Sequence, residues 1–376
     1  MLNGPLPLDL SELEGRRFIC QDPCKLCCLC QPECLPGEVE YFKRNFPNRL
    51  VLKKEPHRHY ALALKKGQGS CSFLKDGRCE VYAHRPHFCR QFPFHIHVGS
   101  RVQVELDLSC RGVWSDQGEE AMIEGLRLVH DNEPEIRKTL KESVPVYREF
   151  ILNCIEAGME VDVGKVRSQV SARLNELTDL RLVASLLEGS VEEDAISIPG
   201  LKAKPSLDGR TMSDLSRSAL EMVTDSLAAD ELFQAPVYCA PDGSWNMYRV
   251  LGQKVEWYVM DAEGDVNKKG EMPMKDVRLR QPEGQDRQVL LDYLKVLNER
   301  DSFMGYAFYL MDEYDYEDPW PNVYGGVLST SILDLLWRTS LLASFFPGLK
   351  DGERMREGII FYDMDRLDAP TLGAFI

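Results

Sequence analysis

The sequence lacks a long apolar run, and this absence argues against a membrane span. The most apolar stretch, residues 331–346, reads SILDLLWRTSLLASFF, carries Asp334 and Arg338, and is too short to cross a bilayer. The first residues, MLNGPLPLDLSELEGRRF, contain no basic segment followed by an apolar run, so we expect no secretory signal. We therefore expect a cytoplasmic protein in a reducing compartment, where disulfides are rare.

Several motifs of common enzymes are also absent. The chain has no Ser/His/Asp set, no phosphate-binding P-loop, no HExxH motif, no internal repeat and no repeated βαβ series. Its net charge of −15 argues against nucleic-acid binding, because phosphate contacts need clustered Lys and Arg. We expect a protein partner instead, and these absences leave open whether the protein is an enzyme.

Cysteine and histidine are scarce after residue 110. The first 110 residues hold ten of the twelve cysteines and six of the seven histidines, and their 16 Lys and Arg against 12 Asp and Glu give a charge of +4. The remainder has 29 against 48, a charge of −19. A mildly basic, Cys/His-rich N-terminal unit is therefore joined to an acidic, Cys-poor remainder.

The pattern of the chain predicts an α+β protein. We expect a small irregular cysteine-rich metal domain at residues 1–118, a helical region at 119–200, and an acidic α+β domain with an antiparallel meander at 201–376. Short hairpins are predicted around the Asp76-Gly77 turn and over FHIHVGSRVQVELDL, and the runs WNMYRV and VEWYVM predict the meander. Helices are predicted at about 36–46, 212–232, 284–299 and 329–345.

The segment from Cys20 to Cys34, CQDPCKLCCLCQPEC, organises the rest of the chain. Six cysteines in fifteen residues cannot be explained as core packing, because a core has no reason to collect so many small thiols in one turn-rich segment. Crowded thiols in a folded protein are either oxidised to disulfides or bound to a soft metal. In a reducing compartment, the segment predicts a metal site.

The spacings alone admit three metal patterns. Cys24-x2-Cys27-x2-Cys30-x3-Cys34 is a ferredoxin spacing, although Leu35 stands where proline is expected and no second copy exists. Cys20-x3-Cys24-x2-Cys27 is the spacing of radical S-adenosylmethionine enzymes, although no βα barrel follows. The third pattern combines the run with distant cysteines and gives eight thiols, enough for two four-cysteine sites. These eight candidate metal ligands are Cys20, Cys24, Cys27, Cys28, Cys71, Cys79, Cys89 and Cys110.

Three separated blocks, CQDPCKLCC, CSFLKDGRCEVYAHRPHFCRQFPF and SCRG, occur here in the order of a known family. Over residues 17–115 the chain resembles the YkgJ-type cysteine-cluster proteins, the CxxCxxCC family of zinc- or iron-chelating domains. The resemblance implies a domain that holds iron–sulfur or zinc. It also implies, through the similar flagellin lysine N-methylases, methyl transfer from S-adenosylmethionine to protein lysines. The chain departs from that branch at Leu29-Cys30-Gln31, and Cys30 and Cys34 are additions to the pattern, as alternative ligands or free thiols.

Two functions therefore stay open. In the first, the protein is a binding or electron-transfer component whose [4Fe–4S] cluster or Zn²⁺ domain acts with a partner. In the second, it is a lysine-methylase-like enzyme that binds S-adenosylmethionine beside its cluster.

Other residues carry further expectations. Arginines beside the cysteines could offset thiolate charge, namely Arg78, Arg85, Arg90 and Arg111. His84 and His87 could replace a cysteine ligand, and the pairs His57/His59 and His95/His97 could form another metal site.

The loop Lys65–Ser70 is a phosphate cradle or a hairpin connection. The acidic loop at 312–318 could receive a basic partner. Cys154 and Cys239 are expected to be isolated structural thiols.

Overall fold

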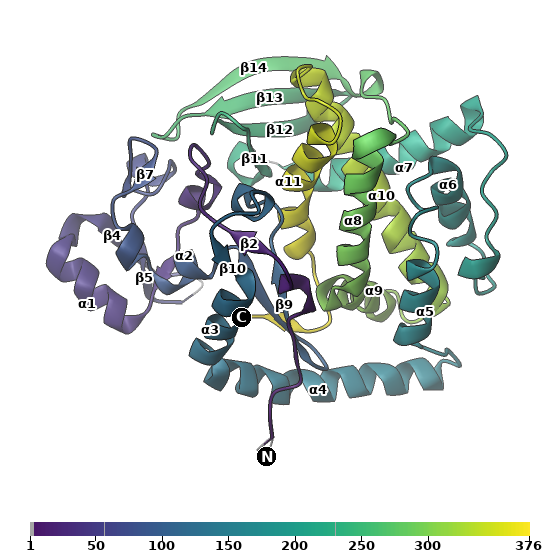
Figure 1. Cartoon of the computed structure of the whole chain (residues 1–376), viewed down its shortest axis with the longest axis horizontal. Helices are drawn as coiled ribbons and strands as arrows, with labels where there is room; N and C mark the ends of the chain where they lie inside the picture. The colour runs from purple at the N-terminus through teal and green to yellow at the C-terminus, as the bar shows by residue number, and fades with distance from the viewer. Residues whose placement is uncertain (1–3, 56, 230) are drawn as a thin grey trace.

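The computed structural model describes residues 4–55, 57–229 and 231–376. Helices predominate and several small sheets lie among them, which confirms the α+β class. The helical region expected after Gly118 is confirmed as α3–α6 (Figure 1). The α-helices are α1 Pro36–Asn45, α2 His87–Gln91, α3 Ala121–Asp131, α4 Glu133–Glu156, α5 Val163–Ser171, α6 Leu180–Gly189, α7 Gly209–Leu227, α8 Gly284–Glu299, α9 Asp301–Glu313, α10 Trp320–Phe345 and α11 Glu353–Leu367.

The strands are short in the N-terminal part and longer in the C-terminal meander. They are β1 Leu8–Asp9, β2 Arg17–Phe18, β3 Glu33–Cys34, β4 Leu50–Lys53, β5 His59–Leu62, β6 Leu74–Lys75, β7 Arg78–Cys79, β8 Phe94–Val98, β9 Val102–Leu106, β10 Glu119–Glu120, β11 Val237–Cys239, β12 Trp245–Leu251, β13 Lys254–Met260, β14 Val266–Pro273 and β15 Ala374–Phe375. The hairpins predicted at β6–β7 and β8–β9, and the antiparallel meander, are confirmed.

One sheet joins segments from both ends of the sequence. Its order is β1-β9-β8-β15, so β1 pairs in parallel with β9 and β15 pairs in antiparallel with β8. Every residue of β9 is buried, because helices cover the sheet. Beside it, the buried guanidinium of Arg300 donates to Asp363 at 2.7 Å, to Glu12 at 2.9 Å and to the carbonyl of Leu106 at 2.6 Å. A full set of acceptors makes this buried charge tolerable.

Helix α10 forms the centre of the main apolar core. Its sequence is apolar on nearly every face, and it packs against α6, α7, α9 and α11. The buried Arg338 on this helix pairs with Asp334 at 2.8 Å and with Asp365 at 2.6 Å. Among residues 4–55, 57–229 and 231–376, no helix combines the length and apolar character that crossing a bilayer requires.

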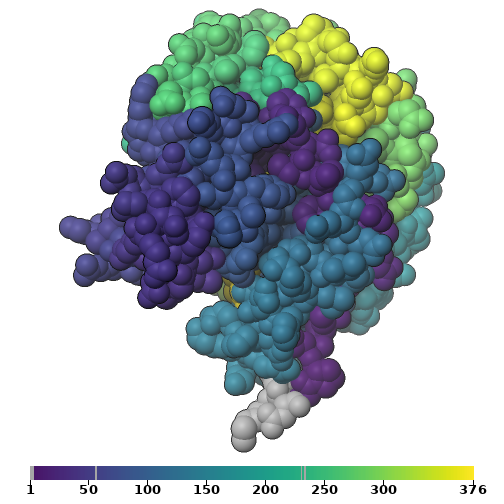
Figure 2. All heavy atoms as spheres, turned by 60° about the vertical axis from the view of Figure 1, so that its left-hand side comes forward, coloured from purple at the N-terminus to yellow at the C-terminus, as the bar shows by residue number. Residues whose placement is uncertain are grey.

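The meander β11–β14 lies against the cysteine-rich region (Figures 1 and 2). The loop between β13 and β14 contacts the 65–70 loop, where the Ser70 N–H donates to the Ala262 carbonyl at 3.0 Å. Lys66 pairs with Asp265 at 2.7 Å, and Lys65 lies 3.8 Å from Glu263. Both lysines therefore face protein carboxylates, which favours the hairpin connection over the phosphate cradle.

The observed helix boundaries differ from those predicted from the sequence in three places. Helix α7 ends at Leu227, five residues before the expected end, and α10 begins nine residues earlier than predicted. The expected acidic loop includes the end of α9, because Asp312 and Glu313 belong to that helix. Helix α11 was not predicted, since its polar and apolar residues show no clear helical period. No measurement here bears on the predicted division at 118 and 200, which stays a prediction.

Candidate metal centre

The cysteine run folds around a single 3₁₀ turn. This turn, η2 (Leu26–Leu29), begins after Lys25, whose carbonyl accepts from the Cys28 N–H at 3.0 Å. The Cys28 carbonyl in turn accepts from the Cys71 N–H at 2.7 Å. That last bond joins the run to the distant cysteines directly, because it holds the Cys71 segment beside the two vicinal thiols.

The distant cysteines are placed by three different local structures. Cys71 bridges to Leu64 next to the 65–70 loop, and Cys79 ends strand β7. The β6–β7 turn uses positive φ at Asp76 and Gly77, which fits the tight hairpin. Cys89 lies in the short helix α2. The sequence blocks that carry these cysteines therefore fold as separate small elements facing η2.

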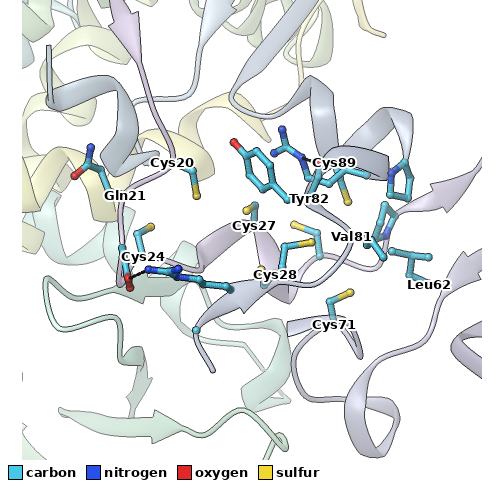
Figure 3. Close-up of a pocket in the computed structure, with 18 of the residues that line it drawn as sticks. Cys20, Gln21, Cys24, Cys27, Cys28, Leu62, Cys71, Val81, Tyr82 and Cys89 are labelled. Atoms are coloured by element: carbon cyan, nitrogen blue, oxygen red, sulfur yellow. Dashed lines mark hydrogen bonds and ion pairs between the residues drawn. The ribbon is translucent and has the colours of Figure 1, made fainter. Parts of the chain in front are cut away.

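A single cavity of about 530 Å³ lies between these elements. In Figure 3, Cys20 and Cys24 lie on one side of it and Cys71 and Cys89 on the other, with Cys27 and Cys28 between them. Seven of the eight predicted ligands line this cavity, together with Cys30. These lining cysteines are Cys20, Cys24, Cys27, Cys28, Cys30, Cys71, Cys79 and Cys89.

Two cysteines of the N-terminal region, Cys34 and Cys110, do not line the cavity. Cys34 is buried in a small apolar cluster with Phe42 and Phe73, and burial raises its pKa to about 12. Cys110, the eighth predicted ligand, precedes the 3₁₀ turn η6 (Arg111–Trp114); burial raises its pKa, and the negative charges of Cys24 and Asp107 act in the same direction. The structure thus places Cys30, rather than Cys34, among the lining thiols.

The lining thiols form an open set of possible metal ligands. Among the described residues, no three cysteine sulfurs lie within 4.8 Å of one another. One closed zinc site uses four ligands, whereas eight thiols line this cavity. The donor set is therefore soft and thiol-rich, with more thiols than one closed four-cysteine site requires.

Two pairs of thiols shift each other's pKa. The thiol of Cys28 lowers the pKa of Cys27, and Cys27 raises that of Cys28. The side chain of Cys239 lowers the pKa of Cys24 to about 6 against the opposing effect of burial. Burial raises the pKa of Cys89. Cys24 and Cys27 are thus the thiols most ready to ionise and bind a metal.

Two of the four predicted arginines, Arg85 and Arg111, supply positive charge near the thiols. Arg85 favours the thiolates of Cys20, Cys27 and Cys79, and its guanidinium lies 3.9 Å from the Tyr82 ring centre. Arg111 favours the thiolate of Cys24. By contrast, Arg78 is exposed beside Asp22, and Arg90 lies 3.6 Å from Glu38.

The histidines occupy other positions. The ring of His84 packs against Tyr41, and the backbone N–H of His87 donates to Glu38. Neither histidine is among the described residues that line the cavity. His57 and His59 lie together with Glu33, their ligand atoms within 4.8 Å of one another. Position therefore favours cysteine over histidine as the ligand type in the cavity.

The two cysteines predicted to be isolated, Cys154 and Cys239, have different surroundings. Cys154 is buried in α4, as expected for a structural thiol. The expectation that Cys239 is isolated is wrong, because its thiol contacts Cys24. No sequence signal marked Cys239, since it stands alone in PVYCAPDG, more than 120 residues after the nearest cysteine of the N-terminal group.

Comparison with known proteins agrees with this geometry. Residues 19–111 match the CxxCxxCC family model, described as "Putative zinc- or iron-chelating domain". The matched range contains every cysteine that lines the cavity, and it also contains Cys110. No curated protein and no solved structure matches the chain significantly. The match covers about a quarter of the chain, and in this range the sequence is similar to that family of domains.

Proposed function

We propose that the protein binds an iron–sulfur cluster in its cysteine-lined cavity and acts in electron transfer with a protein partner. The observation that carries this proposal is that eight thiols line one cavity, twice the number that one four-cysteine zinc site uses. When bound, such a cluster supplies one-electron redox chemistry. The ligands come from the predicted set, with Cys27 at its centre and Cys30 available in place of Cys110.

The rim of the cavity supports a partner that docks there. Ile19 and Tyr82 expose 43% and 49% of their surface, and both line the cavity. The Arg78 side chain beside them is 83% exposed. Exposed apolar and basic groups around a buried centre favour a partner with an acidic rim and an apolar middle.

Anaerobic purification of the full chain tests the proposal directly. We expect a brown protein with about four irons and four sulfides per chain, and a paramagnetic signal after reduction with dithionite. Cys27→Ser should lose most of the colour and iron, because this thiol lies among all the others. Cys154→Ala, a buried thiol in α4, is the matched control and should keep both. A colourless wild-type protein with one or two zincs would overturn the proposal.

A second function is favoured by the size of the cavity. About 530 Å³ is within the range of small-molecule sites, so a cofactor such as S-adenosylmethionine could be accommodated near the cluster. Titration calorimetry on the iron-loaded protein should then show S-adenosylmethionine binding that Cys27→Ser abolishes and Cys154→Ala preserves. A flat titration on well-loaded wild-type protein removes this function and leaves the electron-transfer proposal intact.

A further inference from the structure

The thiol of Cys239 reaches the cysteine run from the opposite half of the chain. Cys239 ends strand β11, is 1% exposed, and belongs to the small apolar cluster against which Cys24 packs. Its thiol donates to the Ala240 carbonyl at 4.0 Å. This residue lies outside the matched range 19–111, so the domain family does not account for it.

Arg111 holds the backbone of Cys239 in place. The guanidinium donates to the Cys239 carbonyl through Nε at 3.0 Å and Nη2 at 2.6 Å. The same guanidinium donates through Nη1 to Glu357 at 2.8 Å, and Glu357 accepts from the Tyr238 hydroxyl at 2.7 Å. Because both ends of this network are buried, the position of the Cys239 thiol is fixed rather than incidental.

The turn between β11 and β12 of the meander packs closely against the segment 23–28. Gly243 has a φ of +77°, and a Cβ there would come within 2.3 Å of the Pro23 carbonyl oxygen. Cys239 also shares a small apolar cluster with Leu26 and Trp245, against which Cys24 and Cys28 pack. The segment 23–28 is therefore held on one side by the meander, with one meander thiol directed at it.

We propose that Cys239 is a metal ligand, supplied to the N-terminal cysteine site by the C-terminal meander. The inference rests on the proposed function, because it requires that the site hold metal. Its ground is geometric: a fully buried thiol, whose backbone Arg111 holds, packs with Leu26 of the cysteine run and against Cys24. Metal binding then fastens the meander to the cysteine domain, and the C-terminal half responds to the occupancy of the site.

The alternative is that Cys239 only fills space in the apolar cluster, and Cys239→Ala separates the two roles. A ligand contributes in the metal-loaded state alone, whereas a packing residue contributes with or without metal. Because Cys239 is also buried, its loss costs some packing in both states. We therefore expect Cys239→Ala to lower the melting temperature of the anaerobically purified protein by several degrees more than that of the chelator-stripped protein. Cys154→Ala, an equally buried thiol far from the site, should change both states alike.

Metal content gives the second readout. After anaerobic reconstitution with ferrous iron and sulfide, Cys239→Ala should retain about half of the wild-type iron or less, and Cys154→Ala should retain all of it. Equal iron in Cys239→Ala and wild type, or equal melting shifts with and without metal, would overturn the inference while the proposed function stands. Wild-type protein that binds neither iron nor zinc would overturn both.

Discussion

The cysteine-rich region and the helical core are held together in different ways. Around the cysteines, apolar burial is limited to two small clusters of six buried residues each, and several strands have two residues. The core around α10 is one continuous cluster that includes the β8–β9 hairpin. With so little apolar burial, the proposed metal centre would supply most of the stability of the first region.

Metal removal should produce the largest difference between the two regions. Structural zinc contributes about 10–16 kcal/mol of apparent binding energy, and a metal of comparable affinity would dominate the stability of residues 19–89. We expect chelation to increase hydrogen exchange strongly in these residues and little in α10. Mass spectrometry of peptides from both regions measures this directly. A uniform increase along the chain would contradict the comparison.

The second prediction concerns the core. Arg300→Met leaves the buried carboxylates of Glu12 and Asp363 without their shared cation, and such a loss costs about 3–5 kcal/mol. Denaturant unfolding monitored by circular dichroism measures the loss. Arg127→Met is the control, because Arg127 pairs with Glu124 on the surface of α3 and its removal should cost less than about 1 kcal/mol. Similar losses in both variants would show that the buried network contributes no more to the free energy of unfolding than a surface ion pair.

A third prediction uses pH to probe the core alone. Burial raises the pKa of Glu105 from 4.5 to about 7, against the favourable charge of Arg300 and the hydrogen bonds from Ser302. Below pH 4.5 the carboxyl is protonated in both states; between 4.5 and 7 only the unfolded chain releases the proton. Its contribution to stability is therefore lost as pH rises through this interval, by an amount on the order of 3 kcal/mol.

The variant Glu105→Gln checks this sign. Because an amide does not titrate, the variant should lose less stability than wild type between pH 5 and pH 7.5 in denaturant melts. Glu119→Gln in the exposed strand β10 is the control, and it should follow the wild-type curve. A parallel curve for Glu105→Gln would contradict the assigned shift.

The smallest expected effect tests how closely the two regions are joined. Gly243 and Gly252 both have positive φ in turns of the meander, so alanine at either position costs about 1 kcal/mol of strain. Only Gly243→Ala would also meet the Pro23 carbonyl, since the space around Gly252 is open. Gly243→Ala should therefore lower metal content, and Gly252→Ala should not. Equal metal content in both variants would show that the contact between Gly243 and Pro23 does not affect the metal site.

Local patterns in the sequence carried much of this description. The Asp76-Gly77 turn, the alternation over β8–β9 and the period of α8 each depend on neighbouring residues, and all three are confirmed. The cysteine run likewise predicted where the lining thiols gather. The pairing of β15 with β8 and the approach of Cys239 to Cys24 were not predictable, because no local periodicity encodes contacts between residues hundreds of positions apart.

The buried network of Arg300 also constrains the order of events during synthesis. Strand β9 is synthesised early. Arg300, which donates to the Leu106 carbonyl, and Asp363, which accepts from Arg300, are synthesised much later. Until then, the Leu106 carbonyl lacks the buried donor that it has in the folded protein. The sheet itself is complete only when β15 has also been made, because β15 pairs with β8.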